Sequence, residues 1–196
     1  GRRGDCRGDE PGFVTGLTHL AGARVRLRPL SLEDLDRLVA YRSDPEVARH
    51  QAWDSYDAAA ALALITEMAD STPGRPGRWH QWGIEEIVTG QLVGDCGLFT
   101  QEDGVQGEIG FTLAPDAQGR GLATEAVTLV LQTAFGRLGF HRVVANTDPL
   151  NARSAALLAR LGFRHEGRSI ESVRIRGAWV DDEHFALLAW EWRARD

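Results

Sequence analysis

A loop with two glycines connects an apolar strand to the longest predicted helix of this chain. The strand is expected over residues 108–113 and the helix over residues 122–138, with Gly119 and Gly121 between them. The first N–H groups of a helix have no acceptor inside it, and the helix dipole gives them a partial positive charge. Glycine lets a bulky anion approach such a backbone closely, and Arg120 adds a permanent cation. The segment therefore predicts a phosphate or pyrophosphate site, with an ordinary turn as the alternative interpretation.

Two common phosphate-binding motifs do not fit this loop. A P-loop needs Lys followed by Ser or Thr after its second glycine, whereas Leu122 and Ala123 follow Gly121. A dinucleotide-binding fingerprint needs a third Gly or Ala where Thr124 stands. A generic nucleotide-binding α/β protein stays open as an interpretation, and binding of ATP or NAD would favour it.

The rest of the chain alternates between strand and helix patterns. Strands are expected over residues 24–28, 79–87, 92–100, 108–113, 142–147, 164–175 and 183–192. Helices are expected between a Ser31 cap and Asp44, and over residues 56–69, 122–138 and 151–161. This order predicts an α/β (α+β) fold with a mostly antiparallel central sheet of about seven strands, flanked by about four helices. Residues 1–22, rich in Gly, Arg and Asp, are expected to form a flexible leader to a single domain over residues 23–196.

Composition excludes several classes of protein. The formal net charge of -6 argues against a nucleic-acid-binding role, which needs a basic face, and favours a cationic substrate. No apolar stretch approaches the roughly 20 residues of a membrane helix, so no membrane partner is expected and a cytoplasmic location is predicted. Cys6 and Cys96 offer no disulfide framework, and the scattered histidines have no zinc-binding spacing, so no metal site is expected.

Three motifs in register resemble one family. The run Gln118-Gly119-Arg120-Gly121-Leu122-Ala123 resembles the acyl-coenzyme A loop of the GNAT superfamily of N-acetyltransferases. Downstream, Asn151-x-x-Ser154 and Leu161-Gly162-Phe163 resemble its second signature. With Glu108-Ile109-Gly110-Phe111 before the loop, the chain looks most like the branch of ribosomal-protein N-terminal acetyltransferases, the RimJ/RimL type. The resemblance covers roughly residues 24–192, and Trp190 and Trp192 fit its closing strand.

The resemblance implies acetyl-coenzyme A (acetyl-CoA) as the cofactor and a GNAT fold, whose sheet contains a splayed parallel pair. Here the pair would be residues 108–113 and 142–147. Pantetheine would contact the backbone of Phe111, Thr112 and Leu113, and Asn151 would cap its helix and touch the ligand. The pyrophosphate would be held by the loop residues Gln118, Gly119, Arg120, Gly121, Leu122, Ala123 and Thr124.

The family's reaction is direct attack of an amine on the thioester. A free amine is mostly protonated at neutral pH, so a base must remove its proton. Glu108 is the best candidate for that base, and a solvated glutamate at a strand end is the alternative. Ser154 is the candidate acid for the leaving thiolate, because this chain's two tyrosines, Tyr41 and Tyr56, lie far upstream of the position where many relatives use tyrosine. An ordinary first-turn serine is the alternative there.

The acceptor site is the least specified part of the sequence. It should lie between the N-terminal helices and the last two strands, with His50, Trp53, Asp54, Trp82, Glu85 and Asp181 as candidates by position. The acceptor would be a protein N-terminus or a small-molecule amine, and the resemblance allows a homodimer. A non-catalytic acyl-coenzyme A sensor or scaffold of the same fold is the alternative function. The presence of Glu108 and Ser154 beside an intact loop favours the enzyme.

Overall fold

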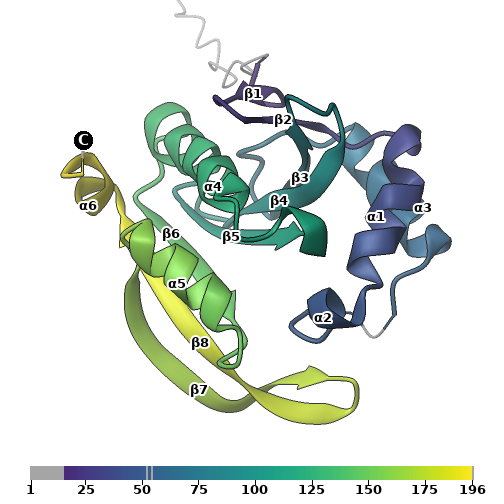
Figure 1. Ribbon diagram of the computed structural model, residues 1–196. Helices are drawn as coiled ribbons and strands as arrows, with labels where there is room; N and C mark the ends of the chain where they lie inside the picture. The colour runs from purple at the N-terminus through teal and green to yellow at the C-terminus, as the bar shows by residue number, and fades with distance from the viewer. Residues whose placement is uncertain (1–15, 52, 54, 196) are drawn as a thin grey trace, which may run out of the picture.

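The computed structural model describes residues 16–51, 53 and 55–195 of the chain. They form an eight-stranded sheet in the order β1-β2-β3-β4-β5-β6-β8-β7 (Figure 1). Its strands are Leu20–Ala21 (β1), Val25–Pro29 (β2), Arg78–Glu86 (β3), Leu92–Thr100 (β4), Gln106–Leu113 (β5), Arg142–Thr147 (β6), Arg164–Ile175 (β7) and Ala178–Leu188 (β8). Only β5 and β6 run parallel among these strands; the other neighbours are antiparallel. The predicted mixed, mostly antiparallel fold is confirmed, with one strand more than expected.

The additional strand lies in the segment that the sequence assigned to a flexible leader. β1 pairs with β2, and Leu17 is buried, with its carbonyl oxygen accepting a hydrogen bond of 3.1 Å from Trp82 Nε1. Leu17 is thus buried and the sheet begins at Leu20, upstream of the expected start at residue 23. Composition misled here because Leu17 and Leu20 are too few to form a periodic pattern. The earlier part of the predicted leader, residues 1–15, lies outside the described residues.

The four predicted helices correspond to α1 (Leu35–Arg42), α3 (Ala58–Ala69), α4 (Leu122–Gln132) and α5 (Ala152–Arg160). Two short helices, α2 (Pro45–Ala48) and α6 (Ala189–Arg193), were not predicted. α6 corrects the expected closing strand, because Trp190 and Trp192 are helical. The alternation of Leu188, Trp190 and Trp192 imitates a strand, but the carboxylate of Glu191 accepts a hydrogen bond of 2.9 Å from the N–H of Leu188 and stabilises a helical turn.

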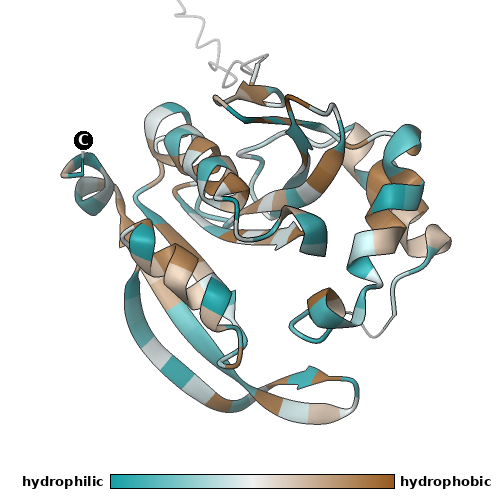
Figure 2. Ribbon diagram, viewed as in Figure 1, coloured by the Kyte–Doolittle hydropathy of each residue, from teal (hydrophilic) through white to brown (hydrophobic). Residues whose placement is uncertain are grey.

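A large part of the core lies between the sheet and α4, which packs against β2, β4 and β5 (Figure 1). Buried residues of α1, α3 and α5 contribute to the same core. Ala126, Val127, Val130 and Leu131 of α4 are buried, as the helical spacing of apolar residues predicts. The helix continues into a π-helical turn, Thr133–Arg137, and Gly139 follows it with a positive φ of 69°. β1 and β7 form the two edges of the sheet. β7 is largely hydrophilic (Figure 2), which protects an edge strand against pairing with other chains.

Candidate active site

The two parallel strands separate after three paired positions. β5 and β6 pair at Gln106 with Arg142, Gly107 with Val143 and Glu108 with Val144. Both strands continue beyond this point, β5 to Leu113 and β6 to Thr147, but no described strand pairs with β5 on that side. β6 remains paired with β8 along its whole length, so β5 and β6 diverge into a V. Backbone N–H and C=O groups on the free edge of β5 are thus left for a ligand to satisfy.

The glycine loop opens beside this V and presents unpaired backbone donors. Within the described part of the chain, no acceptor is found for the N–H groups of residues 119–124, which span the loop and the first helical turn. Gly119 and Gly121 have φ angles of 74° and 77°, a conformation that favours glycine. A Cβ at Gly119 would meet nothing within 4 Å, so the space beside the loop is open. The predicted anion site therefore has the donors and the room that it needs.

Arg24 contacts the loop on its carbonyl side. Its Nη1 donates to the carbonyl oxygen of Arg120 at 2.8 Å and its Nη2 to that of Gly121 at 3.3 Å. Its Nε also pairs with Glu125 in the first turn of α4 at 3.0 Å, and Glu125 accepts a second bond, of 2.7 Å, from the Arg24 N–H. Because the loop carbonyls point toward Arg24, the N–H groups are free to point the other way.

Arg24→Ala is expected to weaken coenzyme A binding roughly fivefold, because the Arg24 side chain orients the loop that presents the N–H donors. The expected effect is modest, since exposed ion pairs and their hydrogen bonds each contribute little free energy. Arg26→Ala is the matched control, since the two side chains are 54% and 51% exposed and both pair with a glutamate. Isothermal titration calorimetry measures both affinities. Equal affinity of the two variants for coenzyme A would show that Arg24 does not support the loop.

Two side chains of the loop have partners within the protein. Arg120, the permanent cation of the loop, forms an ion pair with Glu86, which lies at the end of β3. Gln118 donates from Nε2 to the carbonyl oxygen of Leu113 at 3.1 Å and accepts a bond of 2.7 Å from Arg153 Nη1. Arg153, in the first turn of α5, thus places a second cation beside the loop, which sequence reasoning missed.

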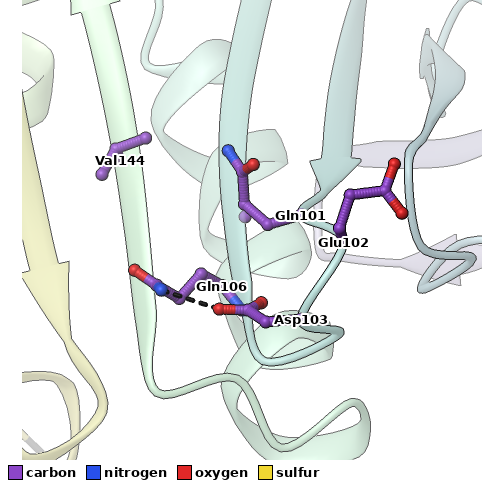
Figure 3. A pocket seen from close by; sticks show the side chains of 6 residues that line it. Gln101, Glu102, Asp103, Gln106 and Val144 are labelled. Carbon is purple, nitrogen blue, oxygen red and sulfur yellow. Dashed lines mark hydrogen bonds between the residues drawn. The ribbon is translucent and has the colours of Figure 1, made fainter.

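A cavity of about 520 Å³ lies at the open end of the V. Its walls include Glu108, Gly110, Phe111 and Thr112 of β5, Asn146 and Thr147 of β6, Asp148, and Val180, Asp181 and Asp182 of β8. Arg42 of α1, Glu67 of α3, and His50 and Trp53 from the segment between α2 and α3 line it on the other side. A smaller pocket of about 250 Å³ lies near the paired end, where Gln106 Nε2 donates to Asp103 (Figure 3). The larger cavity therefore joins the free edge of β5 to the region expected to hold an acceptor.

Glu108 lies where the two strands part, since it is the last residue of β5 that pairs with β6. Its Oε1 accepts a hydrogen bond of 3.3 Å from Asn146 Nδ2, and its Oε2 has no partner among the described residues. Burial raises the pKa of the Glu108 carboxyl above its usual range; the Asn146 hydrogen bond lowers that pKa and the negative charge of Asp182 raises it. A half-buried carboxylate with a raised pKa and one free oxygen can act as a base.

The candidate acid lies at the start of α5. Asn151 is the N-cap of this helix, and its Oδ1 accepts a hydrogen bond of 3.1 Å from the N–H of Ser154. The Ser154 hydroxyl forms no hydrogen bond with another described residue, and Ser154 is not part of the cavity wall. The predicted cap is therefore present, and the Ser154 hydroxyl is free to donate.

The structure brings three of the predicted acceptor residues together and separates two. His50, Trp53 and Asp181 line the cavity. Trp82 is fully buried in the core, and Glu85 pairs with Arg26 and Arg28, so neither side chain can contact an acceptor without disrupting the fold. Asp54 lies outside the described residues.

Each of the three cavity residues has a partner. His50 Nδ1 lies 2.7 Å from Asp148 Oδ2, and Arg49 Nε donates to His50 Nε2 at 3.0 Å, so the Nδ1–H of His50 donates to Asp148. Trp53 stacks on the guanidinium of Arg42, whose Cζ lies 4.8 Å from the centre of the ring. Asp181 accepts hydrogen bonds from the N–H of Glu171 and from Arg168 Nε, both 2.8 Å long, which hold the pKa of its carboxyl below the usual range.

Sequence reasoning missed a buried ion pair in the cavity wall. Arg42 of α1 donates to both oxygens of Asp95 of β4, at 3.0 and 2.6 Å, and both side chains are nearly inaccessible to solvent. Asp182 and Asp148 were missed as well. Burial raises the pKa of Asp182, the neighbouring His184 lowers it, and the negative charge of Asp148 raises it. Their positions within β8 and directly after β6 were the available signals, but acidic residues in and after exposed strands are common.

The described residues contain no cluster of three or more His, Cys, Asp or Glu side chains that could hold a metal ion. In the same part of the chain, none of the helices combines the length and the apolar character needed to span a bilayer.

Comparison with known proteins assigns the chain to a family. A family model described as acetyltransferase (GNAT) domain matches residues 24–164. The chain is 33% identical over 172 residues to the Bacillus licheniformis protein named uncharacterized N-acetyltransferase p20, covering 86% of this chain and 95% of that protein. It is 38% identical over 84 residues to the ribosomal protein uS5-alanine N-acetyltransferase of Escherichia coli (strain K12), covering 43% of each.

Solved structures share the fold. A GNAT-family acetyltransferase from Bacillus anthracis has a TM-score of 0.80 at 20% identity, covering 88% of this chain and 99% of that one. Mycobacterium smegmatis RimJ in complex with CoA-disulfide has a TM-score of 0.73 at 23% identity, covering 87% and 88%. The V between β5 and β6, the glycine loop and these matches define an acetyltransferase. The chain belongs to the GNAT family, and its relatives include the RimJ-like ribosomal-protein acetyltransferases.

Proposed function

We propose that this enzyme transfers the acetyl group of acetyl-CoA to a primary amine, by direct attack of the amine on the thioester. One observation carries the proposal: the V between β5 and β6 opens into a cavity with Glu108 at its apex and the unpaired N–H groups of the glycine loop at its side. The family supports acetyl transfer in general, and the acceptor and the roles of individual residues are our proposal.

The residues around the V fit coenzyme A. The free N–H groups of residues 119–124 suit its diphosphate, and Gly119 leaves room for it. The unpaired edge of β5 offers backbone partners for the pantetheine amides at Phe111, Thr112 and Leu113. A Cβ at Gly110 would meet only the far edge of the Trp79 ring, at 4.0 Å, so space is left above the strand.

Acetyl-CoA supplies an activated acyl group, and the chain's own residues manage the protons. Glu108, with Oε2 free, accepts the proton of the incoming ammonium ion directly or through a water molecule. The Ser154 hydroxyl donates a proton or a hydrogen bond to the departing sulfur. Backbone N–H groups of β5 near Phe111 or Thr112 stabilise negative charge on the acyl oxygen.

The cavity favours a cationic acceptor. Asp148, Asp181 and Asp182 line it together with Glu108, and their charges attract an ammonium ion. The E. coli relative is named as an acetyltransferase of a ribosomal-protein alanine, which supports a protein N-terminus as acceptor for this chain too. A small-molecule amine satisfies the same charges, so both belong to the proposal.

Release of free thiol from acetyl-CoA in the presence of a panel of amines tests the function. The panel contains an alanine-starting peptide, its N-acetylated form and several small polyamines. We expect amine-dependent release of thiol, and no release with the acetylated peptide. Tight binding of acetyl-CoA without turnover of any amine would contradict the proposal and favour a sensor.

The pH dependence of kcat/KM for the amine is expected to show an acidic limb set by Glu108. The base form of Glu108 exists only above its pKa, and burial raises that pKa above the ordinary value of 4.5. Activity should therefore fall as pH falls through a midpoint above 4.5. Stopped assays across pH measure this limb, and a midpoint below 4.5 would mean that the titrating group is not Glu108.

A further inference from the structure

A row of four hydrogen-bonded side chains crosses the sheet from Glu108, one on each of four neighbouring strands. Asn146 Nδ2 of β6 donates to Glu108 Oε1 of β5 at 3.3 Å. Asn146 Oδ1 lies 2.9 Å from His184 Nδ1 of β8, and His184 Nε2 lies 2.7 Å from Ser169 Oγ of β7. The spatial order of the strands is β5-β6-β8-β7, and Asn146 and His184 stand directly opposite each other. The row therefore links the proposed base to the edge of the sheet.

The chemistry of Glu108, Asn146 and His184 fixes the direction of the first two bonds. A carboxylate only accepts, so Asn146 must turn its NH₂ group toward Glu108 and its oxygen toward His184. That oxygen needs a donor, so His184 must carry a hydrogen on Nδ1. Ser169 is compatible with this arrangement, because its hydroxyl can donate a hydrogen bond to Nε2 or accept one from it.

We infer that His184 is a positioning residue for the base: it orients the Asn146 amide, and Asn146 then holds one oxygen of Glu108 at the apex of the V. Without a donor at Nδ1 of His184, the amide is free to rotate and to bring its oxygen against the Glu108 carboxylate, which would repel it. An amide does not pass protons along, so the row positions Glu108 and does not conduct a proton. The free Oε2 of Glu108 then stays directed at the acceptor.

The inference deepens the proposed function, since it assigns a purpose to the row only if Glu108 is the base. Other charged and titratable groups share the cavity with Glu108, and the charge of Asp182 among them acts on Glu108 directly. They are Asp182 and Asp181 of β8, Asp148 with its partner His50, the paired Arg42 and Asp95, and Glu67 of α3. All of these groups are retained when His184 is changed. A shift of the Glu108 pKa that depends on whether the substituted side chain keeps a donor at the position of Nδ1 therefore reports on the hydrogen-bonded row alone.

Two substitutions of His184 separate its two nitrogen atoms. The amide nitrogen of asparagine is bonded to Cγ, as Nδ1 of histidine is, so His184→Asn keeps a donor for Asn146. The amide nitrogen of glutamine lies one bond further out, near the position of Nε2, so His184→Gln loses the donor that faces Asn146. His165→Gln is the control, because His165 is an exposed histidine of β7 that pairs with Glu183.

Two readouts are measured on each variant of the full chain. One is the pH dependence of kcat/KM for the amine, and the other is a carbon-13 NMR titration of the Glu108 carboxyl, assigned by the loss of its signal in Glu108→Gln. Loss of the Asn146 hydrogen bond should raise the Glu108 pKa by about half a unit in His184→Gln. It should also lower kcat/KM for the amine roughly fivefold to tenfold, with KM for acetyl-CoA changed less than about twofold.

His184→Asn and His165→Gln are expected to match the unmodified enzyme in both readouts. The inference is overturned if His184→Gln leaves the Glu108 titration unchanged, or if His184→Asn shifts it as far as His184→Gln does. The NMR titration decides this whether or not Glu108 is the base. Full turnover by Glu108→Gln would instead overturn the catalytic role in the proposed function, so the two failures are distinguishable.

Discussion

Gly121→Val is expected to weaken coenzyme A binding at least about 100-fold, because several charge-assisted bonds from backbone N–H groups to the diphosphate are lost together. Gly121 has a φ of 77°, which a β-branched residue adopts only under strain. A Cβ there would also lie 3.2 Å from Arg24 Nη2, the group that supports the loop from behind. Valine would therefore change the conformation of the loop that presents the donors. Calorimetric titration with coenzyme A measures the effect.

Gly90→Val is the matched control for this prediction. Gly90 has a similar φ of 66° and lies in the turn between β3 and β4, where an added Cβ would meet nothing within 4 Å. Both substitutions should lower the melting temperature by a comparable amount, since a left-handed conformation costs an L-residue about 1–2 kcal/mol. If Gly121→Val binds coenzyme A as tightly as Gly90→Val does, the loop is not the diphosphate site.

Glu108→Gln is expected to lower kcat by roughly 100-fold or more, the usual range for loss of a general base, with the affinity for acetyl-CoA changed less than about twofold. Glutamine has the same shape and can still accept a hydrogen bond from Asn146, but it cannot accept the proton of an ammonium ion. Steady-state kinetics that follow formation of the acetylated amine measure kcat, and calorimetric titration measures the affinity for acetyl-CoA.

Glu67→Gln controls for the loss of one negative charge from the cavity. Glu67 lines the same cavity from α3 and is exposed, so its removal changes the net charge equally without touching the apex of the V. We expect a change in KM for the amine of about threefold or less, since exposed charges are screened by salt. Equal loss of kcat in both variants would mean that charge alone, and not a base at Glu108, drives the reaction.

The parts of the fold that the sequence predicted well are those with a clear local pattern. The bounds of β4, β6 and β7 agree with the expected ranges, because alternating or apolar runs end at turn residues there. The glycine loop and the Asn151 cap were also predictable, since a helix start requires particular residues at particular positions. β1 was missed because two residues carry no periodic signal.

The cavity wall could not be predicted, because its pairs join residues far apart in the chain. Arg42 and Asp95 are separated by 53 positions, and His50 and Asp148 by 98. No local pattern records such a contact; it exists only after α1 packs on β4 and the loop after α2 approaches the end of β6. Trp82 and Glu85 lie away from the cavity for the same reason, since their partners Leu17 and Arg28 come from distant strands or loops.

A crystal structure of the enzyme with coenzyme A tests the central claim most directly. We expect diphosphate oxygens within about 3.2 Å of several N–H groups of residues 119–124, pantetheine along the unpaired edge of β5, and the sulfur beside Glu108. A coenzyme A molecule bound elsewhere, or strands β5 and β6 paired beyond Glu108 with the loop donors bonded to the protein itself, would contradict it.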